Sequence, residues 1–239
     1  PAFLAAYAYE SSLDMSVIEL DQNTGNRALT RNRAAEHAAN DMFVFIDDDT
    51  IPLSDTALAR TAAAGEAGRF LCGARRYWSD LDWDRDLFTS LIKSQSYEDL
   101  KDQCVYPRGI NWRHGYRKLF EYTFVANYGA VNREDFWAVG GFDDDFLSEY
   151  DHEDVDLMYR LYLNGCSFKC LHDDLSVAHL NHPIKPSDSE SRASSVDRFR
   201  EREQKRGYAF KVNHLFGVYE NDGEAILDPI NLDGPHSYQ

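Results

Sequence analysis

Three consecutive acids, Asp47-Asp48-Asp49, directly follow the apolar run Met42–Ile46. Because an unbroken apolar run is typical of a strand buried on both faces, we expect this strand inside a parallel sheet flanked by helices. Ligands of open α/β sheets bind outside the carboxyl ends of the strands. Carboxylate oxygens suit Mg²⁺ or Mn²⁺, which in turn bind phosphate oxygens. The triplet therefore predicts a metal and phosphate site; the alternative is a strand end whose acids merely face water.

A second pair of acids, Glu153-Asp154, stands at the start of an expected helix. Acids in a first turn are stabilised by the helix dipole, so their presence alone requires no catalytic role. The preceding Gly140-Gly141-Phe142 and several further acids favour a helix start that faces a cleft. A carboxylate at such a position could act as the general base that deprotonates an acceptor hydroxyl.

Two histidines, His179 and His182, follow the apolar Val177-Ala178. A histidine in a strand is usually a packed or hydrogen-bonded residue. As a neutral imidazole it could instead complete the coordination of Mn²⁺ beside an aspartate. The sequence leaves open which role applies and which of the two histidines is the ligand.

The composition indicates an enzyme rather than a nucleic-acid-binding protein. The chain has 239 residues, 43% of them hydrophobic, and a formal net charge of −16, so it can bury a core but offers no basic run to a phosphate backbone. We find neither a membrane-spanning apolar run nor a signal peptide, and expect a reducing, cytoplasmic location, or one peripheral to a membrane through segments absent from this chain. The cysteines are predicted to be ordinary thiols: Cys72, Cys104, Cys166 and Cys170.

Alternating strand and helix signals predict the α/β class with a mainly parallel sheet. Strands are expected at 16–20, 42–46, 70–72, 121–131, 167–171 and 176–180. Helices are expected at 28–39, from a cap at Ser54-Asp55 to Gly65, and at 132–136, 151–164 and 196–205. We predict a catalytic domain over residues 1–182 and a polar extension with a short helix over residues 183–239. An aromatic-rich insertion at residues 77–118 is either an irregular subdomain with its own small core or a loop system that stacks on a sugar acceptor.

Several stretches occur together in a recognisable order: NRALTRN at residues 26–32, FVFIDDDTIPLSD at 43–55, GAVNREDFWAVGGFDDDF at 129–146 and HEDVDLMYRLYLNG at 152–165. They resemble the GT-A glycosyltransferases over about residues 16–182. The similarity is to the β-1,4-galactosyltransferase catalytic domain and to the broad inverting glycosyltransferase family 2, which includes the chondroitin polymerases. The set is much more specific than a lone pair of spaced acids.

The resemblance implies a GT-A fold and a role for each matching residue. Asp49 would ligate the metal, Mn²⁺ or Mg²⁺, with His179 as co-ligand, and Ser176 replaces a methionine that binds metal in the galactosyltransferases. Asp154 would be the catalytic base of an inverting reaction. Acceptor-binding residues would be Glu153 and Tyr150. Donor-binding residues would be Arg27, Arg31, Asp47, Asp48, Tyr128 and Gly129, although the motif needs only the outer two acids of the triplet.

The predicted function is metal-dependent transfer of a sugar from a nucleotide-sugar, a UDP-sugar, to a hydroxyl acceptor such as a glycan. One departure from the family pattern concerns its first strand, which binds uridine. In this chain Phe3–Tyr9 is either a shortened form of this strand or a remnant of the helix that follows it. Two alternatives stay open. One is a nucleotidyltransferase or nucleotide-sugar synthase, and the other is a non-catalytic glycan-binding module with a degenerate GT-A core.

Overall fold

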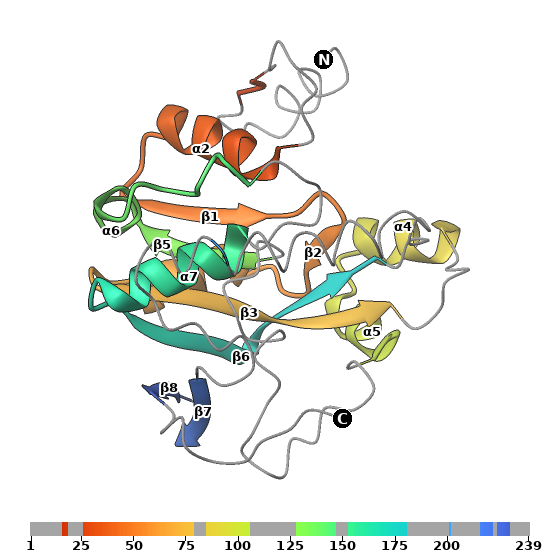
Figure 1. Cartoon of the computed structure of the whole chain (residues 1–239). Coiled ribbons are helices and arrows are strands. Elements are labelled where there is room, and N and C mark those ends of the chain that lie inside the picture. Colours follow the sequence, from red (N-terminus) through yellow and green to blue (C-terminus); the bar gives the residue numbers. More distant parts are fainter. Residues whose placement is uncertain are drawn as a thin grey trace.

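The computed structural model describes residues 16–18, 26–78, 85–105, 128–146, 153–180, 201, 216–221 and 224–229. Helices lie on a central sheet, as Figure 1 shows. The strands of this sheet are β1 (Met42–Ile46), β2 (Thr50–Pro52), β3 (Arg69–Trp78), β4 (Cys104–Val105), β5 (Tyr128–Asn132) and β6 (Ser167–His179). The helices are α2 (Arg27–His37), α3 (Ala57–Ala64), α4 (Arg85–Lys93), α5 (Tyr97–Asp102), α6 (Arg133–Ala138) and α7 (Glu153–Leu163). The predicted α/β class is confirmed.

The sheet has the strand order β1-β5-β3-β6-β2, with β4 paired to β3. Among the described strands only β3 and β6 pair in parallel, and the other pairs are antiparallel. This part of the sheet is therefore mixed, which differs from the mainly parallel sheet that the sequence predicts. The apolar run of β1 shows that helices cover the sheet, but it carries no signal for the direction of the neighbouring strand.

Strand side chains alternate between two hydrophobic layers. On one face, Phe43 and Phe45 of β1 and Phe70 of β3 join the buried side chains of α2, α6 and α7. On the other face, Leu71 of β3 and Ala130 of β5 join α3. This period of two is what a pleated strand imposes. The sheet is thus covered by α2, α6 and α7 on one side and by α3 on the other.

Within the insertion predicted at residues 77–118, the described residues form the end of β3, the helices α4 and α5, and strand β4. Leu100 of α5 and Cys104 of β4 lie in one buried cluster with Leu53, just after β2, and Ala178 of β6, and apolar side chains of α4 pack against this cluster. The expected irregular structure is therefore wrong for residues 85–105, because the apolar residues of these short helices recur at helical spacing among many charges. The two helices therefore pack next to β2, which follows the acid triplet, and β6, which ends at His179.

Three further predictions differ from the structure. The strands expected at 167–171 and 176–180 are one strand, β6, with an irregularity of register opposite Gly73/Ala74. A hairpin, β7 (Phe216–Asn221) and β8 (Glu224–Pro229), stands in the polar extension where no strand is predicted. Ser16–Ile18 belong to no helix or strand.

Other predictions fall wholly or largely on residues outside those described. They are the strand at Phe3–Tyr9, residues 19–20 and 121–127, Tyr150, His182 and, apart from Glu201, the helix at 196–205. The cysteines whose side chains are described, Cys72, Cys104 and Cys166, are buried free thiols. Within the described ranges, no helix has the length and apolar content needed to cross a membrane.

Candidate active site

The acid triplet forms the turn between β1 and β2. The backbone N–H of Thr50 donates to the carbonyl of Asp47 at 3.1 Å and closes this turn. The side chains of Asp47 and Asp49 are about one quarter exposed, at 25% and 29%, whereas Asp48 is exposed. The turn therefore holds the two outer acids against the fold and leaves the middle one exposed.

Asp49 lies beside His179 because of the register of β2 and β6. Thr50 pairs with His179, and the backbone N–H of Leu180 donates to the carbonyl of Asp49 at 2.8 Å. His179 Nε2 then lies 3.3 Å from Asp49 Oδ2. The structure thus brings together the two residues predicted as metal ligands. Among the described residues, no group of three or more His, Cys, Asp or Glu side chains is suited to hold a metal ion.

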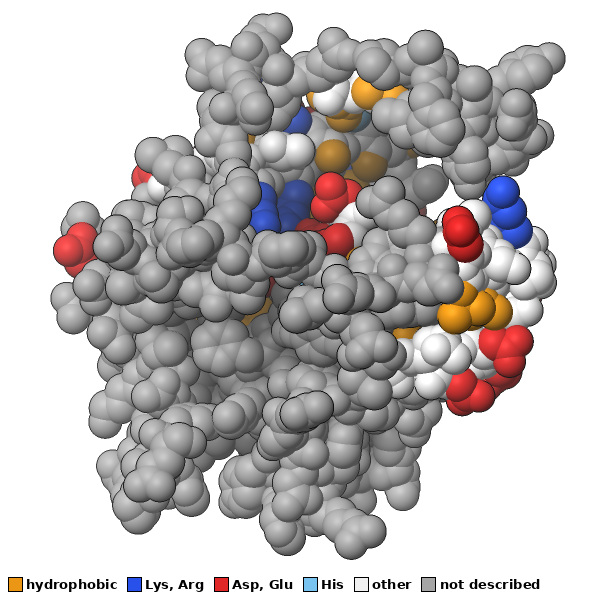
Figure 2. Space-filling model, turned by 90° about the vertical axis from the view of Figure 1, so that its right-hand side faces the viewer, with side chains coloured by type: hydrophobic (Ala, Val, Ile, Leu, Met, Phe, Trp, Pro, Cys, Tyr) orange, Lys and Arg blue, Asp and Glu red, His pale blue; other side chains and the backbone are white. Residues whose placement is uncertain are grey.

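Arg31 of α2 connects the turn to the start of α7. Its Nη2 donates to Asp47 Oδ1 at 2.8 Å, and its Nη1 donates to Glu153 Oε1 at 2.7 Å. Figure 2 faces the side toward which β1 points and shows acidic side chains beside basic ones near its centre. Burial alone would lower the pKa of Arg31, but Glu153, Asp47 and Asp154 outweigh it and raise that pKa. The guanidinium therefore stays charged between the two carboxylates.

Glu153 is a buried carboxylate with only 3% of its surface exposed. Burial and, to a smaller extent, repulsion by Asp154 raise its pKa, the positive charge of Arg31 lowers it, and the result is a pKa of about 7. Its Oε2 is buried and has no hydrogen-bond partner within the described part of the chain. Glu153 is therefore a buried carboxyl with a raised pKa beside a second carboxyl, Asp154, and groups with perturbed pKa values are common at active sites.

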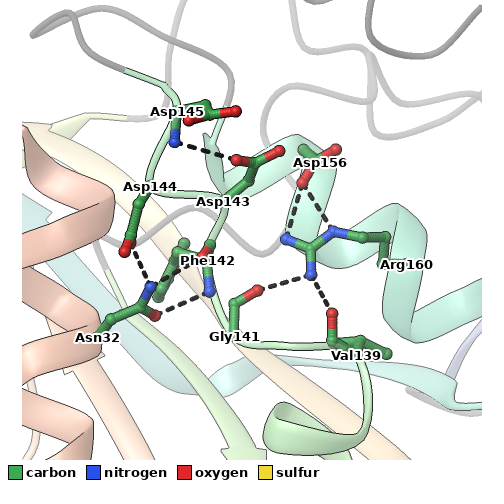
Figure 3. Close-up of polar contacts among 9 residues, drawn as sticks. All are labelled: Asn32, Val139, Gly141, Phe142, Asp143, Asp144, Asp145, Asp156 and Arg160. Atoms are coloured by element: carbon green, nitrogen blue, oxygen red, sulfur yellow. Dashed lines mark hydrogen bonds and ion pairs between the residues drawn. The ribbon is translucent and has the colours of Figure 1, made fainter. Parts of the chain in front are cut away.

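The loop after α6 is fastened to α2 by Asn32, as Figure 3 shows. Asn32 Nδ2 donates to the carbonyl of Phe142 at 2.8 Å and to Asp144 Oδ1 at 2.6 Å, and its Oδ1 accepts the Phe142 N–H at 2.9 Å. Gly141 has φ +70°, and a Cβ there would lie 2.7 Å from Asn32 Oδ1. Glycine at this position is what allows the close contact.

The same loop is fastened to α7 by Arg160, also drawn in Figure 3. Arg160 Nη1 donates to the carbonyls of Val139 and Gly141, both at 2.6 Å, and its Nε donates to the buried Asp156 at 2.8 Å. Asn32 and Arg160 thus hold α2, the loop and the first turns of α7 in one arrangement. Sequence reasoning missed both residues; the spacing of Asp156 and Arg160 on one helix face was the available signal.

The remaining predicted site residues are not all brought to this place. Arg27 is exposed in the first turn of α2. The Tyr128 side chain is 1% exposed in the core, where its hydroxyl lies 2.8 Å from that of Thr61. Gly129 lies inside the sheet, between β1 and β3. The Tyr128 side chain is therefore in the core, while its backbone pairs with Ile46, the residue before Asp47, and the donor-binding role of Tyr128 and Gly129 stays a prediction.

The part of the chain that contains the acid turn matches a known family. The family model described as "Glycosyl transferase family 2" matches residues 1–124, more than half of the 239 residues. This chain belongs to glycosyl transferase family 2. The α/β architecture of this family 2 chain agrees with the predicted GT-A fold. The predicted likeness to β-1,4-galactosyltransferases in particular stays a prediction.

Among solved structures, this family 2 chain is similar to one described as "Crystal structure of GalNAc-T7 with UDP, GalNAc and Mn2+". The identity is 10% and the TM-score 0.49, over 75% of this chain and 35% of that chain. The family 2 chain therefore spans about a third of the length of that protein. No curated protein matches it.

Proposed function

We propose that this chain moves a hexose from a nucleotide-sugar, a UDP-sugar, to a hydroxyl of an acceptor such as a glycan. The reaction is metal-dependent and inverts the anomeric configuration. The observation that supports this most is the bridge made by Arg31, because it holds Asp47 of the acid turn and Glu153 of α7 within one hydrogen-bonded unit. A donor held at the turn and an acceptor held at α7 would meet there.

The residues at the turn fit a divalent cation. Two ligands about 2.1 Å from an octahedral ion, in neighbouring positions, lie about 3 Å apart, and Mg²⁺ is usually bound by one or two carboxylates together with phosphates and waters. The 3.3 Å between Asp49 Oδ2 and His179 Nε2 is close to that separation. A bound Mg²⁺ or Mn²⁺ would neutralise charge on the diphosphate leaving group. Asp49 and His179 would hold the ion, while Arg27 and Arg31 would supply positive charge on the donor side.

Asp154 is the proposed base. It lies in the first turn of α7, is partly buried, and interacts electrostatically with both Glu153 and Arg31. A carboxylate on the acceptor side removes the proton of the attacking hydroxyl as the new bond forms. One base and one displacement invert the anomeric carbon, and no second carboxylate nucleophile is needed.

The test is a panel of nucleotide-sugars incubated with the protein and Mn²⁺, with release of the nucleoside diphosphate as the readout. Slow hydrolysis of the donor requires no known acceptor, so it can identify the donor first. Hydrolysis of one uridine donor that stops on chelation supports the proposal. If no donor is hydrolysed and calorimetry detects no manganese-dependent UDP binding, the proposal is wrong.

A further inference from the structure

Arg31 contacts both sides of the proposed site with different nitrogens. Nη2 binds Asp47 on the donor side, and Nη1 binds Glu153 on the acceptor side. The guanidinium carbon also lies 5.4 Å from the centroid of the Phe142 ring, and the side chain is only 14% exposed. A planar fork can satisfy two carboxylates in fixed directions, whereas a lysine ammonium on a flexible stem holds neither direction.

The charges around Glu153 oppose one another. Arg31 approaches from α2 and favours the charged carboxylate, while Asp154 on its own helix and the burial of Glu153 favour the protonated form. Asp47, on the turn between β1 and β2, accepts a hydrogen bond from Arg31 and shares the positive charge of Arg31 with Glu153. Arg31 also interacts with Asp154. The positive charge of Arg31 therefore acts on both members of the acidic pair.

We propose that Arg31 is a positioning residue for catalysis as well as a donor-side residue: it holds the Glu153–Asp154 pair in place and favours its charged form, so that Asp154 can accept a proton. This inference rests on the proposed function, in which Asp154 is the base. Neighbouring carboxyls titrate as a unit, and a proton retained by the pair leaves no strong base.

The consequence for pH dependence follows from the sign of the interaction. Arg31 lowers the pKa of Glu153, which is about 7 when Arg31 is present. Removal of a positive charge next to a carboxyl raises the carboxyl pKa, by about 1 to 3 pH units for a close partner. The acidic pair of a variant without Arg31 therefore stays protonated at neutral pH and loses its proton only at higher pH.

The test is the dependence of kcat on pH for Arg31→Met and Arg31→Lys, with Arg33→Met as the matched control on the same helix. Arg33 forms an exposed ion pair with Glu36. Within the described part of the chain, no hydrogen bond joins its side chain to a proposed site residue. We expect the acidic limb of the kcat profile to move up by about 1 pH unit or more in Arg31→Met and by less in Arg31→Lys. The Arg33→Met profile should match that of the unmodified protein. A loss of kcat by the same factor at every pH, with an unmoved limb, would overturn the inference.

A second measurement needs no substrate. Carboxyl carbon NMR of the free protein, assigned with Glu153→Gln and Asp154→Asn, should show the pair titrating at higher pH in both Arg31 variants than in the unmodified protein. If transfer proceeds but this titration does not move, the inference is wrong and the proposed function stands. If the titration moves while every donor is inert, Arg31 does control the pair, and the proposed function is what fails.

Discussion

His179 and Asp49 face one another across the β2–β6 pair, with 3.3 Å between Nε2 and Oδ2. The contact follows from strand register, because Thr50 pairs with His179 and the neighbouring backbone groups are hydrogen-bonded. The position of Asp49 is therefore set by a distant strand as well as by its own turn. The two proposed ligands are therefore held by the sheet, which is a more rigid support for a site than a loop.

Replacing Asp49 with Ala should weaken manganese-dependent nucleotide binding by at least about tenfold, because loss of a direct ligand should cost no less than loss of its supporting partner. Titration calorimetry with UDP in the presence and absence of Mn²⁺ measures this. Asp41→Ala is the control, since Asp41 is exposed at the opposite end of β1 and should leave binding unchanged. Equal manganese dependence in both variants would remove Asp49 from the metal site.

Replacing Asp154 with Asn should lower the rate of transfer by about 10²- to 10⁴-fold, the usual contribution of a positioned general base. Asparagine has the same shape but takes no proton at neutral pH, so metal-dependent donor binding should remain. Steady-state kinetics and donor calorimetry on one preparation separate the two effects. Donor binding lost together with turnover would argue that Asp154 shapes the donor pocket instead of acting as base.

Replacing Asn32 with Ala should destabilise the fold by about 2 to 4 kcal/mol, because the N–H and the C=O of Phe142 would both lose a partner in a buried place. Urea denaturation followed by circular dichroism measures the free energy of unfolding. Arg33→Ala on the exposed side of the same helix should change it by less than about 0.5 kcal/mol. Equal effects of the two substitutions would mean that the Asn32 contacts contribute little to stability.

Glu153 should make the protein less stable as the pH rises from about 4.5 to about 7. Its pKa is raised to about 7 in the fold, so in this window the folded state retains a proton that the unfolded chain has lost. The free energy of unfolding falls with pH wherever the folded state binds more protons. The full cost is present well above pH 7 and amounts to at most about 3.5 kcal/mol.

Replacing Glu153 with Gln removes this titration. The free energy of unfolding of the variant minus that of the unmodified protein should therefore be larger at pH 8 than at pH 5. Denaturation in urea at the two pH values gives the difference directly. Glu36→Gln is the control, because Glu36 is exposed in an ion pair at 43% side-chain accessibility and should show no such gain. A Glu153→Gln difference that is the same at both pH values would contradict the perturbed titration.

Local signals predicted several elements well. The apolar run Met42–Ile46 is strand β1 at the same residues, and helix α3 stops at Gly65. Helix α6 begins after the cap Asn132, and the backbone turns at Gly140 and Gly141 with positive φ. These features depend on neighbours in sequence, namely side-chain caps and the conformational freedom of glycine. They can be read without knowing the fold.

The pairing of the strands, and the face of the sheet on which each residue lies, were harder to predict from the sequence. The antiparallel partner of β1 is β5, and the strand run Ser167–His179 continues through polar residues because β3 supplies its hydrogen bonds along most of that length. Tyr128 is another example, since the sequence does not show that its side chain lies in the core while its backbone pairs with Ile46 beside the acid turn. Such outcomes depend on which face of the sheet a residue occupies, and this is decided by register.

The sequence by itself determined the kinds of groups in the site: the acid turn after β1, the acidic pair opening α7, and a histidine near the end of a late strand. It also determined where each lies along its own element. Only the tertiary structure decided that His179 meets Asp49 and that Arg31 joins Asp47 to Glu153. The physical reason is that sheet register and helix packing set distances between residues remote in the chain, and burial then sets their charges.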